Sequence, residues 1–225
     1  MADGENASDR ARRVTASTLR AMTERPDVQV TWRAGRPWAG GQEARLPTPP
    51  RDPAPEDVTH LRGSADVAAL RLRFHDLALH ARQRPINQDA SAVFEAAEAA
   101  RLDALGARLY RGTGVNIAGE LDQRYRKAQY SQAKTRDDVP LAEAFRCIAR
   151  ERLAGLAPPP AAERMVELWR PVVEAEAGAL LDALAEHTGD QEAFARQVRD
   201  ILRAMDLLPP EEDEEETGEE ESSDS

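Results

Sequence analysis

The residues whose types could support metal or acid–base chemistry are His75, Asp76 and His80. Imidazole nitrogens and carboxylate oxygens are common metal ligands. On a continuous helix, positions 75 and 80 lie about 140° apart around the axis, so both rings cannot face one ion without distortion. Arg73, Asp76 and His80 instead share one stripe at steps of three and four. The spacing therefore favours a polar seam in which Asp76 bridges Arg73 and His80.

The alternative is hydrolysis by a helical metal phosphohydrolase of the HD type, with His75 and Asp76 as the doublet. Such a site would also require an upstream histidine, for which only His60 qualifies, and a downstream aspartate such as Asp122 or Asp137. His60 stands rather close to the doublet, so the seam is the preferred interpretation.

Trp169 and Arg170, followed by Pro171, are the candidate interface residues, because an aromatic beside an arginine is typical of interface anchors. The pair is equally typical of a helix end packed on the core, and that is the preferred interpretation. Cys147 is the single cysteine, which excludes an internal disulfide and a multi-cysteine zinc site. We expect it to be a small buried residue rather than a nucleophile.

The usual catalytic signatures are absent from the sequence. It has no G-x-x-x-x-G-K-[ST] phosphate loop, no G-x-S-x-G elbow, no H-E-x-x-H and no D-x-S-x-S metal-ion-dependent pattern. The sequence therefore predicts no catalytic residue, no bound cofactor and no metal ligand in this chain itself.

Composition points to a helical protein, since the 225 residues are 32% charged and only 4% aromatic. Of the net charge of −11, ten charges fall in the last fifteen residues; subtracting them leaves −1 for the other 210. A nearly neutral body gives no electrostatic case for nucleic-acid binding. No apolar run has the length of a membrane span, and the charged N-terminus lacks a signal-peptide core, so a cytoplasmic location is expected.

The elements that must position these residues centre on Ser64–Tyr125. Val67, Leu70, Phe74, Leu77 and Ala81 form one helical stripe. Leu72 and Leu79 lie on the opposite side, which places this helix in the middle of a bundle. The next segment carries small residues that allow close helix approach, at Val93, Ala96, Ala100 and Ala104.

Gly63 is predicted to close a short helix that begins at Pro55, with Ser64 capping the next one. A further helix begins near Leu141. Pro171 cannot donate a helical hydrogen bond, so a kink or a new helix is expected there. That segment aligns Met165, Leu168, Val172, Ala175 and Ala179. Asp190 then caps the last helix, whose buried face is Phe194, Val198, Ile201, Met205 and Leu208.

Alternating apolar residues predict a strand at Asp27–Arg33, and the sequence EARL at 43–46 returns as its hairpin partner. The predicted fold is mainly α: a multi-helix bundle with one small β-hairpin near 27–46. We expect residues 1–7 to be disordered, 8–208 to form one helical domain, and 209–225 to be a disordered acidic linker or tail.

Six ordered segments resemble a known family: RPDVQVTW, RPWAGG with ARLPTPPR, RGSADVAALRLRFHD, GARLYRGTGVNIAGELDQRY, RERLAGLAPPPAAERMVELWRP and DQEAFARQVRDILRAMDL. Together they resemble the N-terminal region of the CobT subunit of aerobic cobaltochelatase, from about Asn6 to Leu208.

The resemblance implies a role in cobalamin biosynthesis beside two partners, a CobS-type AAA+ ATPase and a CobN-type large subunit that holds the tetrapyrrole. The complex uses ATP and magnesium to insert cobalt into hydrogenobyrinic acid a,c-diamide. The resemblance is also compatible with a homo-oligomeric ring, formed by several copies of this chain. In that arrangement this region is a non-catalytic subunit, or N-terminal fragment, of a nitrogen–metal ligase.

One departure from the family is expected to matter. CobT-like proteins continue through an acidic linker into a von Willebrand A domain, whereas this sequence stops in what resembles that linker.

The alternative function for this chain is a stand-alone helical module that binds other proteins.

Overall fold

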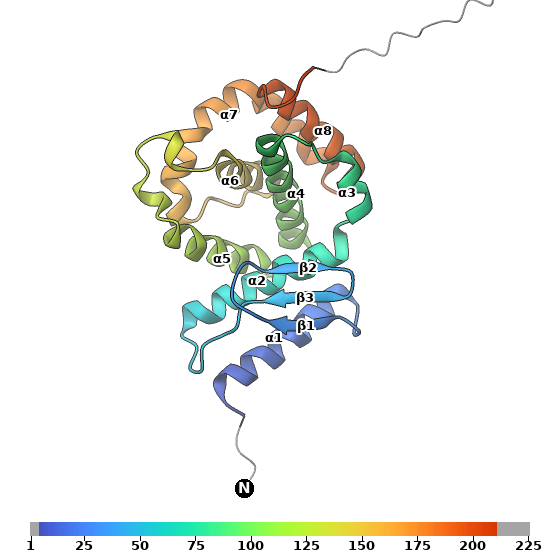
Figure 1. Cartoon of the computed structure of the whole chain (residues 1–225), viewed down its shortest axis with the longest axis vertical. Helices are drawn as coiled ribbons and strands as arrows, with labels where there is room; N and C mark the ends of the chain where they lie inside the picture. The colour runs from blue at the N-terminus through green and yellow to red at the C-terminus, as the bar shows by residue number, and fades with distance from the viewer. Residues whose placement is uncertain (1–4, 211–225) are drawn as a thin grey trace, which may run out of the picture.

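The computed structural model of the chain describes residues 5–210 and is mainly helical over that range (Figure 1). The helices are α1 (Ala7–Thr23), α2 (Pro55–Phe74), α3 (Leu77–Gln83), α4 (Gln88–Leu109), α5 (Thr113–Lys127), α6 (Leu141–Ala154), α7 (Glu163–Leu184) and α8 (Gln191–Ala204). The strands are β1 (Gln29–Trp32), β2 (Trp38–Gly40) and β3 (Glu43–Leu46). The predicted fold class, mainly α with a small N-terminal sheet, is confirmed.

The molecule has a helical end and a sheet end, joined by α2 (Figure 1). At the helical end, α3, α5, α7 and α8 lie around α4 and α6. At the other end the sheet and α1 pack on α2. Because α4 contacts α2, α5, α6 and α8, this one helix forms the centre of the larger core.

Helix α2 is covered on two sides, as its two apolar stripes predict. Ala65, Ala68 and Ala69 are buried with Leu19 of α1 and with residues of the sheet in the smaller core cluster. Leu70 belongs to the larger cluster of the helical end. Helix α2 therefore contributes to the cores of both ends of the molecule.

The small sheet has three strands in the order β1-β3-β2 rather than two. β2 and β3 form a hairpin, with Trp38 opposite Arg45, and Gly41 in the connecting turn has the left-handed φ of 58°. The pairing predicted between 27–33 and 43–46 exists but is parallel, with Gln29 opposite Glu43. The connection between the two predicted strands contains β2, which takes the antiparallel place beside β3.

Gly63 lies inside a continuous α2, so the predicted boundary between two helices at this position is wrong. The glycine serves a close approach instead of a cap. A Cβ at Gly63 would collide with the carbonyl oxygen of Asn116 and lie 2.7 Å from Cβ of Glu120, both on α5. The absent side chain allows α2 and α5 to touch.

The helix stripes predicted near the C-terminus are partly confirmed. Asp190 caps α8 by accepting from the amides of Glu192 and Ala193, and Phe194, Val198 and Ile201 are buried. In α7, Met165 is buried as predicted, but Ala175 and Ala179 are exposed. After Pro171 the buried residues are Val173, Ala177, Leu181 and Leu184, and α7 runs through Pro171 without a new helix.

The first helix begins at Ala7, one residue before the predicted start of the helical domain at residue 8. Asn6 caps α1 by accepting from the Asp9 amide, and the helix itself starts at Ala7. Disorder was predicted for residues 1–7 and 209–225. Of these, residues 1–4 and 211–225 lie outside the described residues.

Candidate functional site

The His75–His80 segment is a junction between two helices rather than part of one helix. Helix α2 ends at Phe74, and Asp76 caps α3 by accepting from the amides of Ala78 and Leu79 at 2.9 Å. These two backbone bonds, that from Leu79 foremost, lower the pKa of Asp76. The predicted stripe therefore stops at Phe74, and Leu77 is 54% exposed.

The junction brings the two histidine rings together, with centroids 4.6 Å apart in an edge-on arrangement. His75 Nδ1 lies 2.7 Å from Oε1 of Glu98, and His80 Nε2 lies 2.8 Å from Oε1 of Glu95. The predicted seam is wrong, because Arg73 reaches Glu24, the residue that follows α1, instead of Asp76. Positions 75 and 80 would lie about 140° apart only on a continuous helix. Because α2 ends at Phe74 and α3 begins at Leu77, the two rings are free to meet.

Arg101 of α4 organises the surroundings of this junction. It is 2% exposed and binds Glu98 with two hydrogen bonds of 2.7 Å. The same guanidinium donates to the carbonyl oxygens of Phe74 at 2.8 Å and of Thr188 at 3.2 Å. Arg101 thus ties the end of α2, the middle of α4 and the turn before α8 to one point.

The carboxylate of Glu98 is ionised in this setting. Burial raises its pKa, but the bonds from Arg101 and His75 outweigh burial, and the pKa of Glu98 is lowered overall. Gln191 completes the junction by accepting from the Asp76 amide at 2.8 Å and donating to the Asp76 carbonyl at 3.0 Å. Within residues 5–210, no three His, Cys, Asp or Glu side chains are grouped so that they could hold a metal ion.

A second buried charge cluster joins α4 to α6. Asp103 accepts from Nη2 of Arg146 at 2.8 Å and lies 3.0 Å from Nε of Arg150. Burial alone would lower the pKa of Arg146, and the charge of Asp103 raises it instead. One carboxylate therefore faces two buried guanidinium groups.

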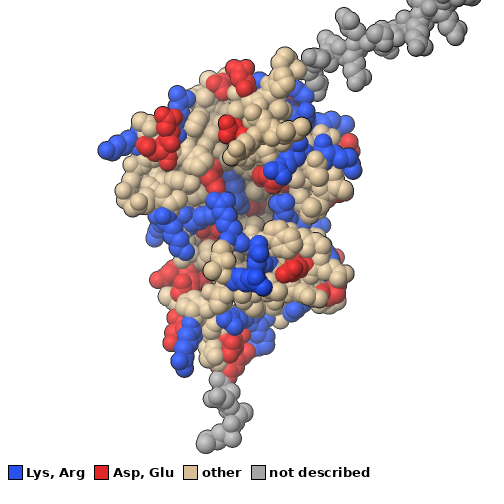
Figure 2. All heavy atoms as spheres, viewed as in Figure 1, with Lys and Arg blue, Asp and Glu red and all other residues tan. Residues whose placement is uncertain are grey.

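A cleft of about 480 Å³ opens between the sheet end and the helical end, where Figure 2 shows Lys and Arg side chains around a hollow. Its arginines come from four different elements or loops: Arg36, Arg71, Arg124 and Arg146. Glu143 in the cleft wall pairs with Arg124 at 3.0 Å and with Arg36 at 3.4 Å. Such a mixed-charge surface suits a polar or charged partner better than an apolar one.

The predicted interface residues lie on α7. Trp169 is half-buried against the larger core, and its Nε1 donates to the carbonyl of Val139 at 3.1 Å. Arg170 pairs with Glu151 of α6 at 2.6 Å and with Glu174 at 3.2 Å. Trp169 therefore helps to close the core, while Arg170 belongs to a partly exposed charge network between α6 and α7.

Cys147 is fully buried, as predicted, and its Sγ lies 3.7 Å from the hydroxyl of Tyr125. Burial raises the pKa of this thiol, which disfavours the reactive thiolate.

Sequence reasoning missed the buried charges Glu98, Arg101, Asp103 and Arg150. For Asp103 a signal was available, because the residues three and four positions away are Ala99, Ala100, Gly106 and Ala107. A lone charge within a patch of small residues on a helix is in position to be buried and paired.

None of the helices in residues 5–210 combines the length and apolar character that crossing a bilayer requires.

No solved structure matches this chain. The sequence model of the family described as "Cobalamin biosynthesis protein CobT" matches residues 5–225. That match includes every described residue and confirms the resemblance carried by the six segments. The chain therefore belongs to the CobT family of cobalamin biosynthesis proteins.

Proposed function

We propose that this chain is a non-catalytic subunit of aerobic cobaltochelatase, or the N-terminal part of one, that docks with a CobS-type AAA+ ATPase. Family membership implies a role in the cobaltochelatase of cobalamin biosynthesis, and the match over residues 5–225 is the observation that carries the proposal. ATP hydrolysis by the partner, with magnesium, then drives insertion of the substrate cobalt into hydrogenobyrinic acid a,c-diamide held by a CobN-type subunit.

A scaffolding role is supported by what the charged side chains do. Arg101 bonds to Glu98 and to the backbone carbonyls of Phe74 and Thr188, and Glu98 also bonds to His75, so these side chains are occupied in holding the fold. Asp76, the acid of the alternative HD doublet, is the cap of α3, and the His75 side chain is fully buried against Glu98. These contacts favour a structural role for the doublet over hydrolysis.

Arg170 and Trp169 are the proposed contact with the ATPase. Arg170 remains about 30% exposed although it pairs with Glu151 and Glu174. An arginine held in place by neighbouring acids has already lost side-chain freedom. Binding a partner that carries a carboxylate therefore costs less conformational entropy.

The test is size-exclusion chromatography with light scattering of the chain mixed with the CobS-type ATPase, ATP and magnesium. We expect co-elution as one defined assembly, weakened by Arg170→Ala. The matched control is Arg126→Ala, which removes an exposed pair with Asp122 on α5 and should leave co-elution unchanged.

Separate elution of the two folded proteins would contradict docking through these residues and would favour a stand-alone interaction module. Unchanged co-elution of the Arg170→Ala variant would instead refute the proposed contact while leaving the docking proposal standing.

A further inference from the structure

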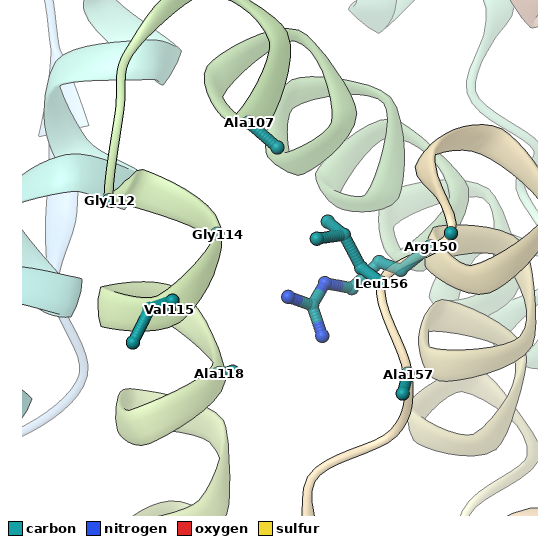
Figure 3. A pocket seen from close by; sticks show the side chains of 9 residues that line it. Ala107, Gly112, Gly114, Val115, Ala118, Arg150, Leu156 and Ala157 are labelled. Atoms are coloured by element: carbon teal, nitrogen blue, oxygen red, sulfur yellow. The ribbon is translucent and has the colours of Figure 1, made fainter.

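A pocket of about 430 Å³ lies between the end of α4, the start of α5 and the segment that follows α6 (Figure 3). Its walls are small and apolar, formed by Ala107, Val115, Ala118, Leu156 and Ala157. The size is within the range of pockets that hold small organic ligands.

One charged side chain reaches into this apolar pocket. Figure 3 shows the Arg150 guanidinium extending from α6 toward α5, between Leu156 and Ala118. The Arg150 side chain is 0% exposed, and its Nη1 and Nη2 have no hydrogen-bond partner among residues 5–210. Nε of Arg150 lies 3.0 Å from Oδ2 of Asp103 as an ion pair, but none of the three buried guanidinium nitrogens makes a hydrogen bond to a described residue.

The charge balance behind the pocket is incomplete. Asp103 is the carboxylate that faces both arginines, and Arg146 already binds it through three contacts of 2.8 to 3.1 Å. The buried Glu120 also acts on the charge of Arg146, whereas Asp103 is the carboxylate within ion-pair distance of Arg150. Because Arg146 already binds Asp103, the positive charge of Arg150 is incompletely compensated. Buried charges in proteins are paired, so an arginine left in this state points to an anion that the pocket receives.

The start of α5 provides a second set of donors at the same place. Gly112 takes the N-cap position with φ of 92° and offers no side chain to cap the helix. The amides of Gly114 and Val115, in the first turn, therefore donate to no capping side chain. These residues line the pocket, and the helix N-terminus carries a partial positive charge that favours an anion.

We propose that this pocket binds the carboxylate of a small ligand with a short apolar body. The two Nη groups of Arg150 form a planar fork that matches the two oxygens of a carboxylate. The amides of Gly114 and Val115 complete the oxyanion contacts, and the apolar walls hold the hydrocarbon part.

Leu156 controls access to the site. A Cβ at Gly114 would lie 3.0 Å from Cδ2 of Leu156, so this side chain covers the first turn of α5. Gly155, with φ of 64°, precedes Leu156 and gives the backbone freedom there. Binding therefore requires the Leu156 side chain to move aside and uncover Arg150.

The direct test is a titration of the folded chain with butyrate, followed by the amide NMR signals of Gly114 and Val115. We expect saturable shifts at these two amides with butyrate, and none with the neutral analogue butyramide. The Arg150→Met variant should weaken butyrate binding about tenfold or more, because hydrogen bonds to a charged group are lost. Inorganic phosphate is titrated in parallel.

Saturation by phosphate but not butyrate would overturn the assignment to a carboxylate. The absence of saturable shifts with either anion would overturn the site, and so would unchanged butyrate binding in the Arg150→Met variant.

A second pair of variants keeps the test decisive if Arg150→Met does not fold. Leu156→Glu places a carboxylate beside the first turn of α5, whereas Leu156→Gln is its neutral control of equal size. We expect Leu156→Glu to have the higher Tm of the two and to abolish the butyrate shifts. Equal Tm values with butyrate binding retained in both variants would refute the proposal.

Discussion

Removing Asp103 tests whether the buried charges of α4 and α6 depend on one carboxylate. The Asp103→Ala variant leaves Arg146 and Arg150 facing each other in the core, with exposed fractions of 8% and 0%. Deleting one partner of a buried ion pair costs about 3–5 kcal/mol, because the remaining charge stays buried without compensation. Domains are stable by only about 5–15 kcal/mol, so this loss is a large share of the total.

The measurement is urea denaturation at pH 7, followed by circular dichroism, together with a thermal scan. For a chain of this length each kcal/mol corresponds to about 2–4 °C, so we expect Tm to fall by about 10 °C. The control is Asp182→Ala, because Asp182 is 62% exposed in its pair with Arg152. That variant should lose no more than about 1 kcal/mol.

A double variant separates lost charge compensation from a simple cavity. Adding Arg146→Met to Asp103→Ala removes one of the two stranded cations and should recover part of the lost stability. A loss below about 1 kcal/mol in the single variant would refute the reasoning. Additive losses in the double variant would likewise show that Asp103 does not act by compensating the arginines.

Further predictions concern single residues. Burial raises the pKa of Asp66 to about 6 although Asn116 donates to it, so ionised Asp66 lowers stability as pH rises from about 4 through 6. Asp66→Asn should therefore raise the urea midpoint at pH 7.5 but not at pH 4.5, and an equal gain at both values would contradict this. Gly63→Ala should cost about 1–3 kcal/mol of stability by overpacking α2 against α5. Its control is Gly178→Ala, whose Cβ meets Glu174 Cβ only at 4.0 Å and which should stabilise the chain by up to about 1 kcal/mol. Comparable urea midpoints for the two variants would refute the close approach at Gly63. The pKa of Glu98 is lowered in the folded chain, so the stability that its ionised form contributes is present above pH about 4.5 and is lost as pH falls through the folded pKa. Glu98→Gln should therefore be less stable than the parent chain at pH 7 and approach it in acid. A difference in urea midpoint that stays constant with pH would contradict this.

Local signals in the sequence predicted much of the fold correctly. Asp190 was identified as a cap because aspartate before an amphipathic run satisfies free helix amides, and it does so here. The strand near 29–32 was predicted from alternating β-branched and aromatic residues, and the strand near 43–46 as its returning partner. Their parallel pairing depends on where the intervening chain runs, and alternation carries no information about that.

Other features depend on contacts between distant segments. Gly63 has the sequence appearance of a helix end, but its partner is α5, more than fifty residues away, so its role becomes visible only when the helices are packed. The end of α2 also depends on a distant segment. Asp76 could continue a helix or cap the next one, and the contacts of Gln191 with the backbone of Asp76 favour the cap.

Helix α4 shows why the buried charges escaped a hydrophobic-pattern argument. Half of its buried residues are small, namely Ala90, Ser91, Ala97, Ala100, Ala104 and Gly106, and such residues allow close contact at several rotations of the helix about its axis. Three charged residues on it remove that freedom, because Glu98 reaches His75 beside α2, Arg101 reaches Thr188 before α8, and Asp103 reaches α6. A rotation by one residue, about 100°, would break all three sets of bonds together. We infer that these charges specify the orientation of α4, while the alanines supply proximity. A neutral variant of the whole set would then be expected to keep its helices and lose their unique packing.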